Sequence, residues 1–310
     1  IVFDNFSPRG VRKLDIEYET LRQVNPGIIV ASLSATGNYG PWSDLLTYGP
    51  SLTALCGVKS LIGYPDTGRI QEDVSDLDPI AATYAVIPIL AALRARRRTG
   101  RGQFIDVAQA EAGIAPLAEA VVEYTMNGRV MAPQGNRHRM KAPHGIFPAA
   151  GDDRWVAISV DSDSAWQTLC EVLALPAAAT HPRFADAYSR LRNVDEVERL
   201  VASGTGSFEA EELAATLQGR GVAAYPVLDA LGVVADEQLA HRRAGRFGVE
   251  TDGISSDEIY SGMPWRFSES PPALRRPVGP VGHDNDYVFG EVLAMTVDEI
   301  QAARASGAIA

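Results

Sequence analysis

The sequence predicts an α/β protein in which a large, doubly wound domain is followed by a small α+β domain. Two observations predict this. Helical patterns alternate with short apolar runs over residues 1–125, and the pattern changes to a hairpin followed by helices from Gly145 onward. Alternating strands and helices are typical of a parallel sheet covered by helices. We expect a large domain with its linker over residues 1–140, a small domain over 141–228 and a return segment over 229–310.

Composition limits the classes of function. Of the 310 residues, 46% are hydrophobic and 22% are charged, which is typical of a globular protein with a large core. Lys and Arg total 28 against 39 Asp and Glu, for a formal charge of −11. A chain this acidic is not expected to bind nucleic acid or an anionic membrane surface. Its two cysteines, Cys56 and Cys170, lie in apolar runs and are expected to be buried, reduced thiols.

The first elements follow from apolar spacing. Residues 1–3 resemble the end of a buried strand, and because the chain opens there without Met we expect an N-terminal part of the domain to be absent from it. Residues 14–25 have helical spacing and are stopped by Pro26-Gly27. The apolar run 28–33 then predicts a buried parallel strand.

Two long loops come next, at residues 35–48 and 63–78, with a small-residue helix expected between them at 51–61. Long loops in compact domains commonly carry function. Asp78-Pro79 then begins a helix that is apolar nearly all round to Leu93, which predicts a buried helix, kinked at Pro88. Its apolar run 79–93 is about 22 Å long, too short for a bilayer core of roughly 30 Å, so no membrane span is expected.

The remaining elements are predicted in the same way. A strand at 103–107 and a helix at 108–126 complete the large domain before a linker rich in Pro, Gly and basic residues. The small domain is expected to contain a hairpin of strands 145–149 and 154–160, helices 162–174, 191–202 and 208–219, and a strand 223–227. Beyond it we expect a helix at 231–244, an irregular stretch at 245–282 and a helical segment at 286–304.

Residue chemistry alone singles out Asp78. An Asp before Pro is a common helix N-cap, and the same position places a carboxylate at the positive end of a helix dipole, where it stays ionised and can act as a nucleophile. Both interpretations stay open at this point. The Gly-bearing stretches match no phosphate-binding loop, and the five histidines have no metal-ligand spacing. The residues predict an α/β enzyme of unspecified chemistry.

Eight short segments occur in the order typical of one family. They are Asp4-Asn5-Phe6-Ser7-Pro8, Asn25-Pro26 with residues 28–32, residues 48–57, Arg98 to Gln103 with Asp106-Val107, Ala142 to Gly145, residues 186–191, residues 221–227 and Pro264 to Phe267. Together they resemble the class III CoA-transferases, the family of formyl-CoA transferase and carnitine CoA-transferase. The resemblance implies a Rossmann-like large domain, incomplete here at its N-terminus, and a homodimer whose subunits interlock.

The resemblance also implies a mechanism. The family's catalytic aspartate precedes its Ala-rich helix, which is the place of Asp78. In the family this carboxylate attacks an acyl-CoA thioester to form a mixed anhydride, and the released CoA then forms an aspartyl-CoA thioester that the acceptor acid resolves. The implied cofactor is coenzyme A, present as the acyl-CoA substrate, with no metal and no redox cofactor. The implied partners are an acyl-CoA donor and a carboxylic acid acceptor.

The same matching places four residues around CoA. Asn5 and Phe6 would lie against it, Lys13 near its phosphates and Tyr48 beside the thioester. For Lys13 the alternative is a plain surface lysine, and for Tyr48 it is core packing. The identity of the donor and acceptor acids is not implied.

The sequence departs from the family in two places. Ala82 stands where the family usually has Gly, four residues after its aspartate, which could narrow the pocket. Residues 135–143 replace the Gly-rich loop of formyl-CoA transferase, so formyl-CoA and oxalate are not expected as substrates. Two alternatives remain: an α-methylacyl-CoA racemase, whose catalytic His would fall at Tyr48, and a non-catalytic half of a tandem CoA-transferase. We expect a cytoplasmic protein.

Overall fold

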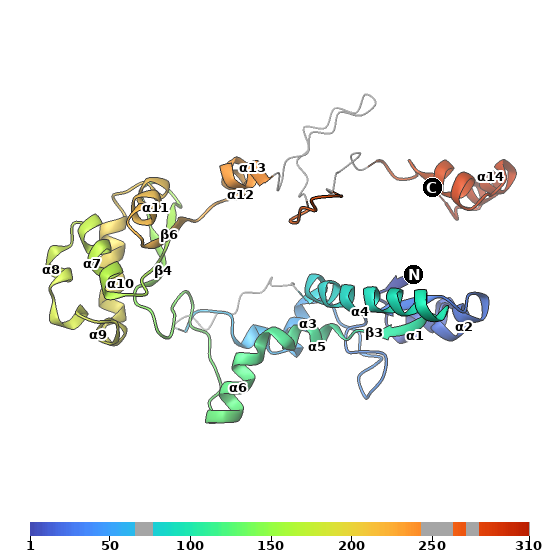
Figure 1. Ribbon diagram of the computed structural model, residues 1–310, viewed down its shortest axis with the longest axis horizontal. Helices are drawn as coiled ribbons and strands as arrows, with labels where there is room; N and C mark the ends of the chain where they lie inside the picture. Colours follow the sequence, from blue (N-terminus) through green and yellow to red (C-terminus); the bar gives the residue numbers. More distant parts are fainter. Residues whose placement is uncertain (66–76, 243–262, 271–278, 310) are drawn as a thin grey trace. The chain divides into compact units, whose positions relative to one another are not determined.

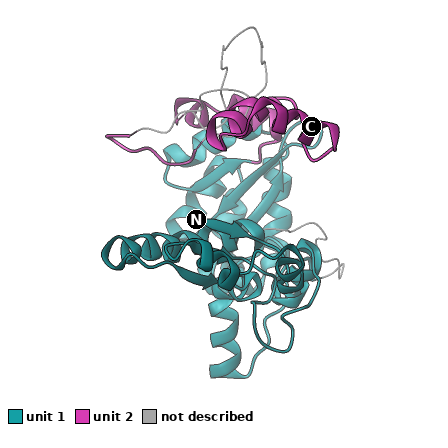
Figure 2. Ribbon diagram, turned by 90° about the vertical axis from the view of Figure 1, so that its right-hand side faces the viewer, with its two compact units in different colours: residues 1–226 teal, residues 227–310 magenta. Residues whose placement is uncertain are grey.

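A computed structural model describes residues 1–65, 77–242, 263–270 and 279–309. The protein is mixed α/β with more helix than strand, as the fold class predicts. Its contacts divide it into two compact units, residues 1–226 and 227–310 (Figure 2). Within the described residues, the strands form two separate three-stranded sheets, and both belong to the first unit.

The first sheet is parallel and has the order β1-β2-β3, formed by β1 (Val2–Asp4), β2 (Ile29–Ser32) and β3 (Gln103–Asp106) (Figure 1). The strands predicted at 28–33 and 103–107 are therefore confirmed. The central strand β2 is buried along its length. The expected burial of the first strand is wrong, because Phe3 on the edge strand β1 is 67% exposed.

The helices around this sheet are shorter and more numerous than the sequence predicts. They are α1 (Pro8–Leu14), α2 (Tyr18–Val24), α3 (Gly49–Leu55), α4 (Leu77–Thr99), α5 (Gln109–Ile114) and α6 (Ala118–Asn127), with 3-10 turns at Val58–Ser60 and Ala115–Leu117. The helix expected over 14–25 begins only at Tyr18. Ser7 caps the unpredicted α1 by accepting a hydrogen bond from the Gly10 N–H, and Asp15 ends that helix in the left-handed region.

Helix α4 corrects the sequence analysis in burial. It begins at Leu77 and continues through Pro88 to Thr99. Its buried residues are Leu77, Ala81, Ala85 and Ala92, whereas Tyr84, Ile87 and Leu90 are 49%, 73% and 60% exposed. The helix buries its alanines against β2 and β3 and exposes its larger apolar side chains. It is therefore not buried all round.

By length and composition alone, the whole helix α4 could cross a membrane. The sequence analysis expected no membrane span because it considered only the shorter apolar run 79–93 of this helix. Among the described residues, one helix meets this criterion, and 22% of the apolar window is buried inside the protein. A single helix of this kind is weak evidence for a membrane span, since core helices of other proteins meet the same criterion.

The turn from α4 into β3 is fixed by a backbone contact that only glycine permits. The Gly102 N–H donates to the Pro26 carbonyl at 2.9 Å. A Cβ at Gly102 would lie 1.7 Å from the carbonyl oxygen of Ile28, at the start of β2. The chain therefore cannot place any side chain there without moving β2 or β3.

The second sheet is antiparallel and has the order β4-β5-β6, formed by β4 (His144–Pro148), β5 (Trp155–Ser159) and β6 (Ala223–Pro226). The predicted hairpin and final strand are confirmed. One face packs on helices to form a core that includes Val156, Ile158, Trp166 and Leu213. These helices are α7 (Asp163–Val172), α8 (Pro176–Ala179), α9 (Ala187–Arg192), α10 (Val194–Thr205) and α11 (Ala210–Gly219), with a 3-10 turn at Pro182–Phe184.

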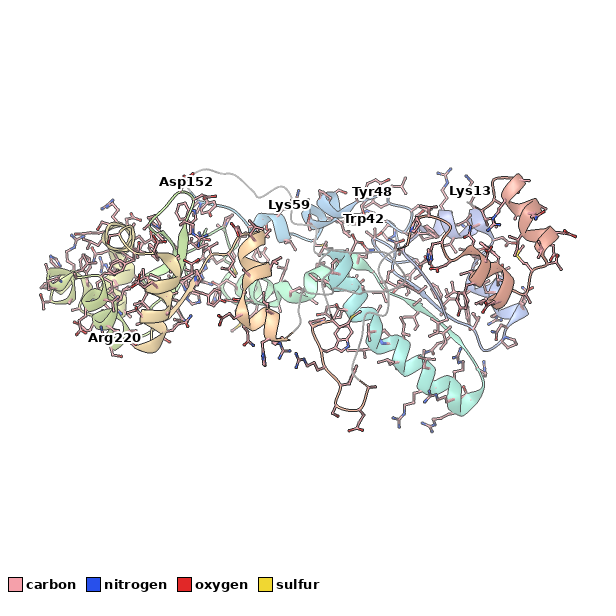
Figure 3. The ribbon with its side chains drawn as sticks, turned by 90° about the horizontal axis from the view of Figure 1, so that it is seen from above. Lys13, Trp42, Tyr48, Lys59, Asp152 and Arg220 are labelled. Atoms are coloured by element: carbon pink, nitrogen blue, oxygen red, sulfur yellow. The ribbon has the colours of Figure 1, made fainter. Side chains whose placement is uncertain are left out.

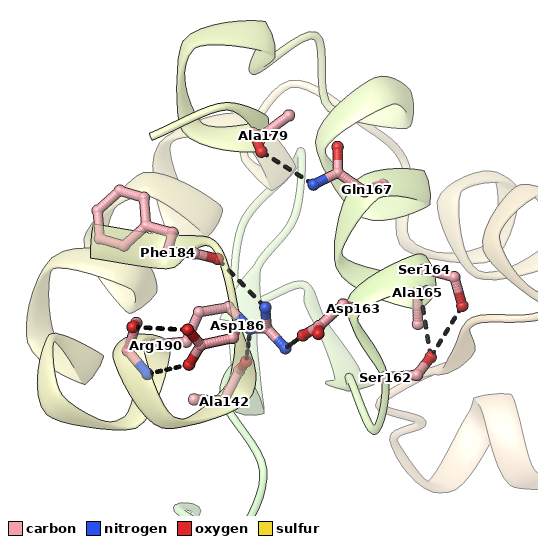
Figure 4. Close-up of polar contacts among 11 residues, drawn as sticks. Ala142, Ser162, Asp163, Ser164, Ala165, Gln167, Ala179, Phe184, Asp186 and Arg190 are labelled. Atoms are coloured by element: carbon pink, nitrogen blue, oxygen red, sulfur yellow. Dashed lines mark hydrogen bonds and ion pairs between the residues drawn. The ribbon is translucent and has the colours of Figure 1, made fainter. Parts of the chain in front are cut away.

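A buried arginine holds the start of this sheet to the helices. The Arg190 side chain is 1% exposed, and it donates to the carbonyls of Ala142 and Phe184 at 2.9 and 3.2 Å. It also forms an ion pair with Asp163 at 2.8 Å (Figure 4). The guanidinium lies over the Trp166 ring. The guanidinium therefore joins α9, α7 and the residue that precedes Pro143 and β4.

The second unit contains short helices. These are α12 (Ala230–Ala235), α13 (Glu237–Arg242), a π-helix η4 (Asp286–Val292) and α14 (Val297–Ala305). The helices predicted at 231–244 and 286–304 are thus each divided in two. Most of the stretch expected to be irregular, 245–282, lies outside the described residues. Thr296 and Glu299 form a capping box that begins α14, and Ile300 is buried.

Replacing Arg190 should destabilise the protein strongly. Arg190→Met leaves two buried carbonyls without a donor and removes the partner of Asp163, so we expect a loss of about 2–4 kcal/mol in the free energy of unfolding. Arg192→Met is the matched control on the same helix, at an exposed position over Tyr188, and should cost less than about 0.5 kcal/mol. Urea unfolding followed by tryptophan fluorescence measures both. Equal losses in the two variants would contradict this role for Arg190.

Candidate active site

Asp78 lies in the first turn of α4. Because the helix begins at Leu77, Asp78 is a first-turn residue rather than the N-cap that the Asp-Pro pair suggests. Its side chain is exposed. The first-turn N–H groups of a helix have no partner within the helix, and the dipole favours negative charge there. The carboxylate is thus accessible to a ligand and lies in a favourable electrostatic position.

The neighbouring residue fixes this position. Leu77 is 1% exposed and packs with Leu52 and Cys56 of the α3 segment. A Cβ on Gly113 in α5 would lie 2.4 Å from the Leu77 Cδ2 atom, so any side chain there would require the leucine to shift. Three helices therefore meet around Leu77, and the exposed side chain of Asp78 follows directly from it.

Tyr48 is the residue before α3. Its backbone N–H donates to the Ser51 hydroxyl at 2.9 Å, which closes the first turn of that helix. The ring is 84% exposed, so Tyr48 does not pack in the core of this unit. Leu52 of α3 packs in one buried cluster with Leu77 of α4. Helix α3, which follows Tyr48, and helix α4, which carries Asp78 in its first turn, are therefore in contact near their N-terminal ends.

Asn5, Phe6 and Lys13 belong to the segment after β1. Asn5 is exposed, Phe6 is 47% exposed and its N–H donates to the Asp4 carboxylate at 3.2 Å, and Lys13 is exposed in the last turn of α1. Figure 3 shows Lys13 well apart from Tyr48. Three cavities among the described residues, of about 730, 590 and 370 Å³, include none of Asp78, Tyr48, Asn5, Phe6 and Lys13 in their lining. Their assembly into one site therefore stays a prediction.

A row of polar residues that the sequence analysis missed lies at the carboxyl ends of the parallel strands. Asp4, Ser32 and Asp106 end β1, β2 and β3 and are paired in register. The Ser32 hydroxyl donates to Asp4 at 3.1 Å, and Asp106 accepts from the Asn38 N–H and from its side-chain amide at 2.9 Å. Ligands of open α/β sheets bind at this edge. The sequence offered one signal for this row, because Asp4 and Asp106 each follow a short apolar run.

A cavity of about 370 Å³ opens beside this row, lined by Asp4, Ser32, Val11, Arg12 and Tyr18 among others. Arg12 is already paired with Asp44 at 3.2 Å. Burial raises the pKa of Asp4 above its ordinary value, and the hydrogen bonds from Ser32 and the Phe6 N–H partly oppose that effect. Some of the residues that line the cavity, such as Asp4 and Arg12, are close in sequence to Phe6 and Lys13, which the resemblance assigns to CoA.

The described residues contain no group of three His, Cys, Asp or Glu side chains that could hold a metal ion. Both cysteines are free and buried, as predicted. Burial raises the pKa of Cys56, and it raises that of Cys170 to about 12, so neither thiol is expected to be a nucleophile at neutral pH.

Comparisons with known proteins identify the family of the chain. Residues 1–285 match the model of CoA-transferase family III. The chain is 28% identical over 309 residues to succinyl-CoA–D-citramalate CoA-transferase of Chloroflexus aurantiacus, covering 100% of this chain and 76% of that one. It is 32% identical over 307 residues to the probable CoA-transferase Rv1866 of Mycobacterium tuberculosis, covering 97% of this chain and 38% of that relative.

A solved structure is also similar. The crystal structure of a CaiB/BaiF family protein from Brucella suis superposes with a TM-score of 0.84 at 27% identity, covering 94% of this chain and 75% of that one. The match extends over nearly the whole chain, so the fold described above is that of this family.

Asp4 should make stability depend on pH. Because its pKa is raised on folding, the folded state holds the proton more tightly than the unfolded chain, and stability falls as the pH rises above 3.8 and through the folded pKa. Asp4→Asn removes this dependence and keeps an acceptor for Ser32. We expect the unfolding free energy of the unmodified protein, relative to Asp4→Asn, to decrease from pH 3.5 to pH 7. Chemical denaturation over this range measures it, and a difference that is constant or increases with pH would contradict the assignment.

Proposed function

Because the chain belongs to CoA-transferase family III, we propose that it transfers CoA from an acyl-CoA to a free carboxylic acid by covalent catalysis at Asp78. One observation carries this proposal. An exposed carboxylate in the first turn of α4 follows directly on a leucine that three helices bury. The named relatives are CoA-transferases, which supports the reaction class.

In the proposed first half-reaction, an Asp78 oxygen attacks the thioester carbonyl carbon. The C–S bond breaks, CoA leaves as the thiolate and an aspartyl mixed anhydride forms. The thiolate then attacks the Asp78 carbonyl, which releases the donor acid as its carboxylate and leaves an aspartyl-CoA thioester. Free first-turn N–H groups of α4 are suited to stabilise the tetrahedral oxyanions.

The second half-reaction reverses these steps with a different acid. The acceptor carboxylate attacks the aspartyl-CoA thioester, the thiolate leaves, and an anhydride between the acceptor and Asp78 forms. Attack of the thiolate on the acceptor carbonyl gives the new acyl-CoA and restores the Asp78 carboxylate. One thioester is exchanged for another, so no electrons or protons are consumed overall.

We assign CoA binding to Asn5, Phe6, Lys13 and Tyr48 as part of this proposal. All four are exposed, and the first two lie beside the carboxyl end of the parallel sheet. The Lys13 ammonium suits a phosphate, and the exposed Phe6 ring offers a surface to the adenine or pantetheine part of CoA. The proposed mechanism calls for no metal and no redox cofactor.

We also propose a cytoplasmic homodimer. The exposed apolar side chains Tyr84, Ile87 and Leu90 form one face of α4, and Val122 and Tyr124 are half-exposed on α6. Large exposed apolar patches on a protein commonly mark an interface. Two reduced, buried cysteines fit a reducing compartment.

Asp78→Asn should abolish transfer. We expect kcat/KM to fall by at least about 10³-fold, because the amide is not a nucleophile toward a thioester. Incubation with a panel of acyl-CoAs, a quench with hydroxylamine or borohydride and mass spectrometry of the peptide spanning residues 66–94 should show a modification at Asp78 that is absent from the variant.

Asp76→Asn is the control two residues earlier and should retain transfer. A folded, dimeric protein without any modification at Asp78 would contradict the covalent mechanism. It would favour the non-catalytic half of a tandem protein instead.

Leu90→Glu should weaken the dimer. Leu90 is 60% exposed in one chain, so the substitution leaves the fold of the subunit unchanged, and a charge in an apolar interface opposes association. Analytical ultracentrifugation should show a dissociation constant raised at least about tenfold relative to the unmodified protein. The proposed dimer would be contradicted if the unmodified protein sediments as a monomer. It would also be contradicted if the unmodified protein is a monomer that binds lipid vesicles through this face of α4.

A further inference from the structure

The glycine at position 113 is not required by the backbone of its own helix. Gly113 is a buried residue of α5, and alanine stabilises a helix better than glycine does. A glycine also loses more conformational freedom on folding than any other residue. The surroundings of α5, rather than its backbone, therefore call for a glycine at this position.

Two helices of the candidate site lie directly against this position. A Cβ on Gly113 would lie 2.4 and 3.3 Å from the two Cδ atoms of Leu77 in α4, and 3.2 Å from the Cys56 Sγ atom at the end of α3. Carbon atoms in ordinary contact are about 3.5–4.0 Å apart. The methyl group of an alanine at position 113 would therefore displace the leucine by about 1 Å.

The side chains around Leu77 leave it little room to move by itself. Leu77, Leu52 and Cys56 are 1%, 2% and 6% exposed and form one cluster. The Cys56 thiol donates to the Ala110 carbonyl of α5 at 3.4 Å, which holds the end of α3 to the same helix. Well-packed clusters respond to an added methyl group by shifts of the backbone as well as of the side chains. A displacement of Leu77 therefore moves the first turn of α4.

The first turn of α4 carries the exposed side chain of Asp78, which follows Leu77 directly in the sequence. A reacting group works well when it is held within about 0.5 Å of its productive position, and a displacement of about 1 Å can lower a rate by about 10²-fold. Gly113 has no side chain that could take part in a reaction. Any influence of this glycine on Asp78 therefore passes through Leu77.

We propose that Gly113 is a positioning residue for Asp78. The absence of a side chain at Gly113 lets Leu77 pack between α3, α4 and α5, and Leu77 in turn holds the backbone of Asp78 where its carboxylate attacks the thioester. This role rests on the proposed function. The sizes of the residues at positions 113 and 77 are then coupled in the rate at which Asp78 is modified, and not in the affinity for CoA.

The test exchanges volume between the two positions. Gly113→Ala adds one carbon atom and Leu77→Val removes one, so the double variant keeps the number of side-chain carbon atoms in the cluster unchanged. Gly219→Ala is the matched control, because an added Cβ at this exposed residue of α11 would meet no other part of the described chain within 4 Å. Rapid quenching after mixing with saturating succinyl-CoA, or with the member of the acyl-CoA panel that modifies Asp78 fastest, gives the rate of modification by mass spectrometry. Isothermal titration calorimetry gives the affinity for CoA.

We expect Gly113→Ala to slow the modification of Asp78 at least about tenfold and to leave the affinity for CoA within about twofold. Adding Leu77→Val to this variant should restore the rate to within about threefold of that of the unmodified protein. Gly219→Ala should change neither quantity. Leu77→Ala is the second variant in case Gly113→Ala does not fold. It keeps the glycine, removes the side chain that holds the first turn of α4, and should also slow the modification without a change in the affinity for CoA.

The role of Gly113 and the proposed function can fail separately. If Asp78 is modified at the unmodified protein's rate in folded Gly113→Ala or in Leu77→Ala, or if Leu77→Val does not restore the rate, Gly113 only packs the core and the proposed function stands. A loss of CoA affinity as large as the loss of rate would overturn the positioning role in the same way. If no acyl-CoA modifies Asp78 in the unmodified protein, although Leu77→Val restores the urea midpoint that Gly113→Ala lowers, the packing contact exists but the proposed function is wrong, and the positioning role is wrong with it.

Discussion

The burial of Leu77 is the constraint on which the candidate active site depends. This side chain occupies the space between α3, α4 and α5, and the missing side chain of Gly113 makes that space. This packing anchors the first described turn of helix α4, and that turn places a carboxylate at the surface directly after a core residue. A carboxylate placed in this way loses little conformational freedom when a ligand binds, because the packing has already fixed its backbone.

The sequence predicts most strands and many helices of the first unit but misjudges what α4 buries. Apolar residues occur on all sides of this helix, so the pattern cannot distinguish the covered face from the uncovered one. The structure buries Ala81 and Ala85, whose small side chains allow close approach to the sheet, and leaves Ile87 and Leu90 exposed. Hydrophobicity by itself favours the opposite choice, because the larger side chains gain more from burial. The close approach of α4 to the sheet favours the small alanine side chains at the contact instead.

The functional residues divide in the same way. Residue type and spacing leave Asp78 with two interpretations, and only the resemblance to a family favours the nucleophile. The row formed by Asp4, Ser32 and Asp106 was missed because it depends on strand register between residues far apart in the sequence. Single-sequence patterns define which residues share one face of one strand. They do not define which strand lies beside it.

The Arg-Thr-Gly-Arg-Gly-Gln stretch, one of the segments that resemble the family, has a structural explanation in this chain. At Gly102 the backbone of one strand passes so close to the next that no side chain fits, and the preceding turn carries the chain from helix to sheet. The glycine at position 102 is thus needed for the chain to form this sheet. A chain that had lost its nucleophile would keep this glycine for as long as it kept the sheet. Genome surveys that recognise the family by this stretch would therefore count active and inactive descendants alike, and a search for the proposed nucleophile would have to inspect position 78 separately.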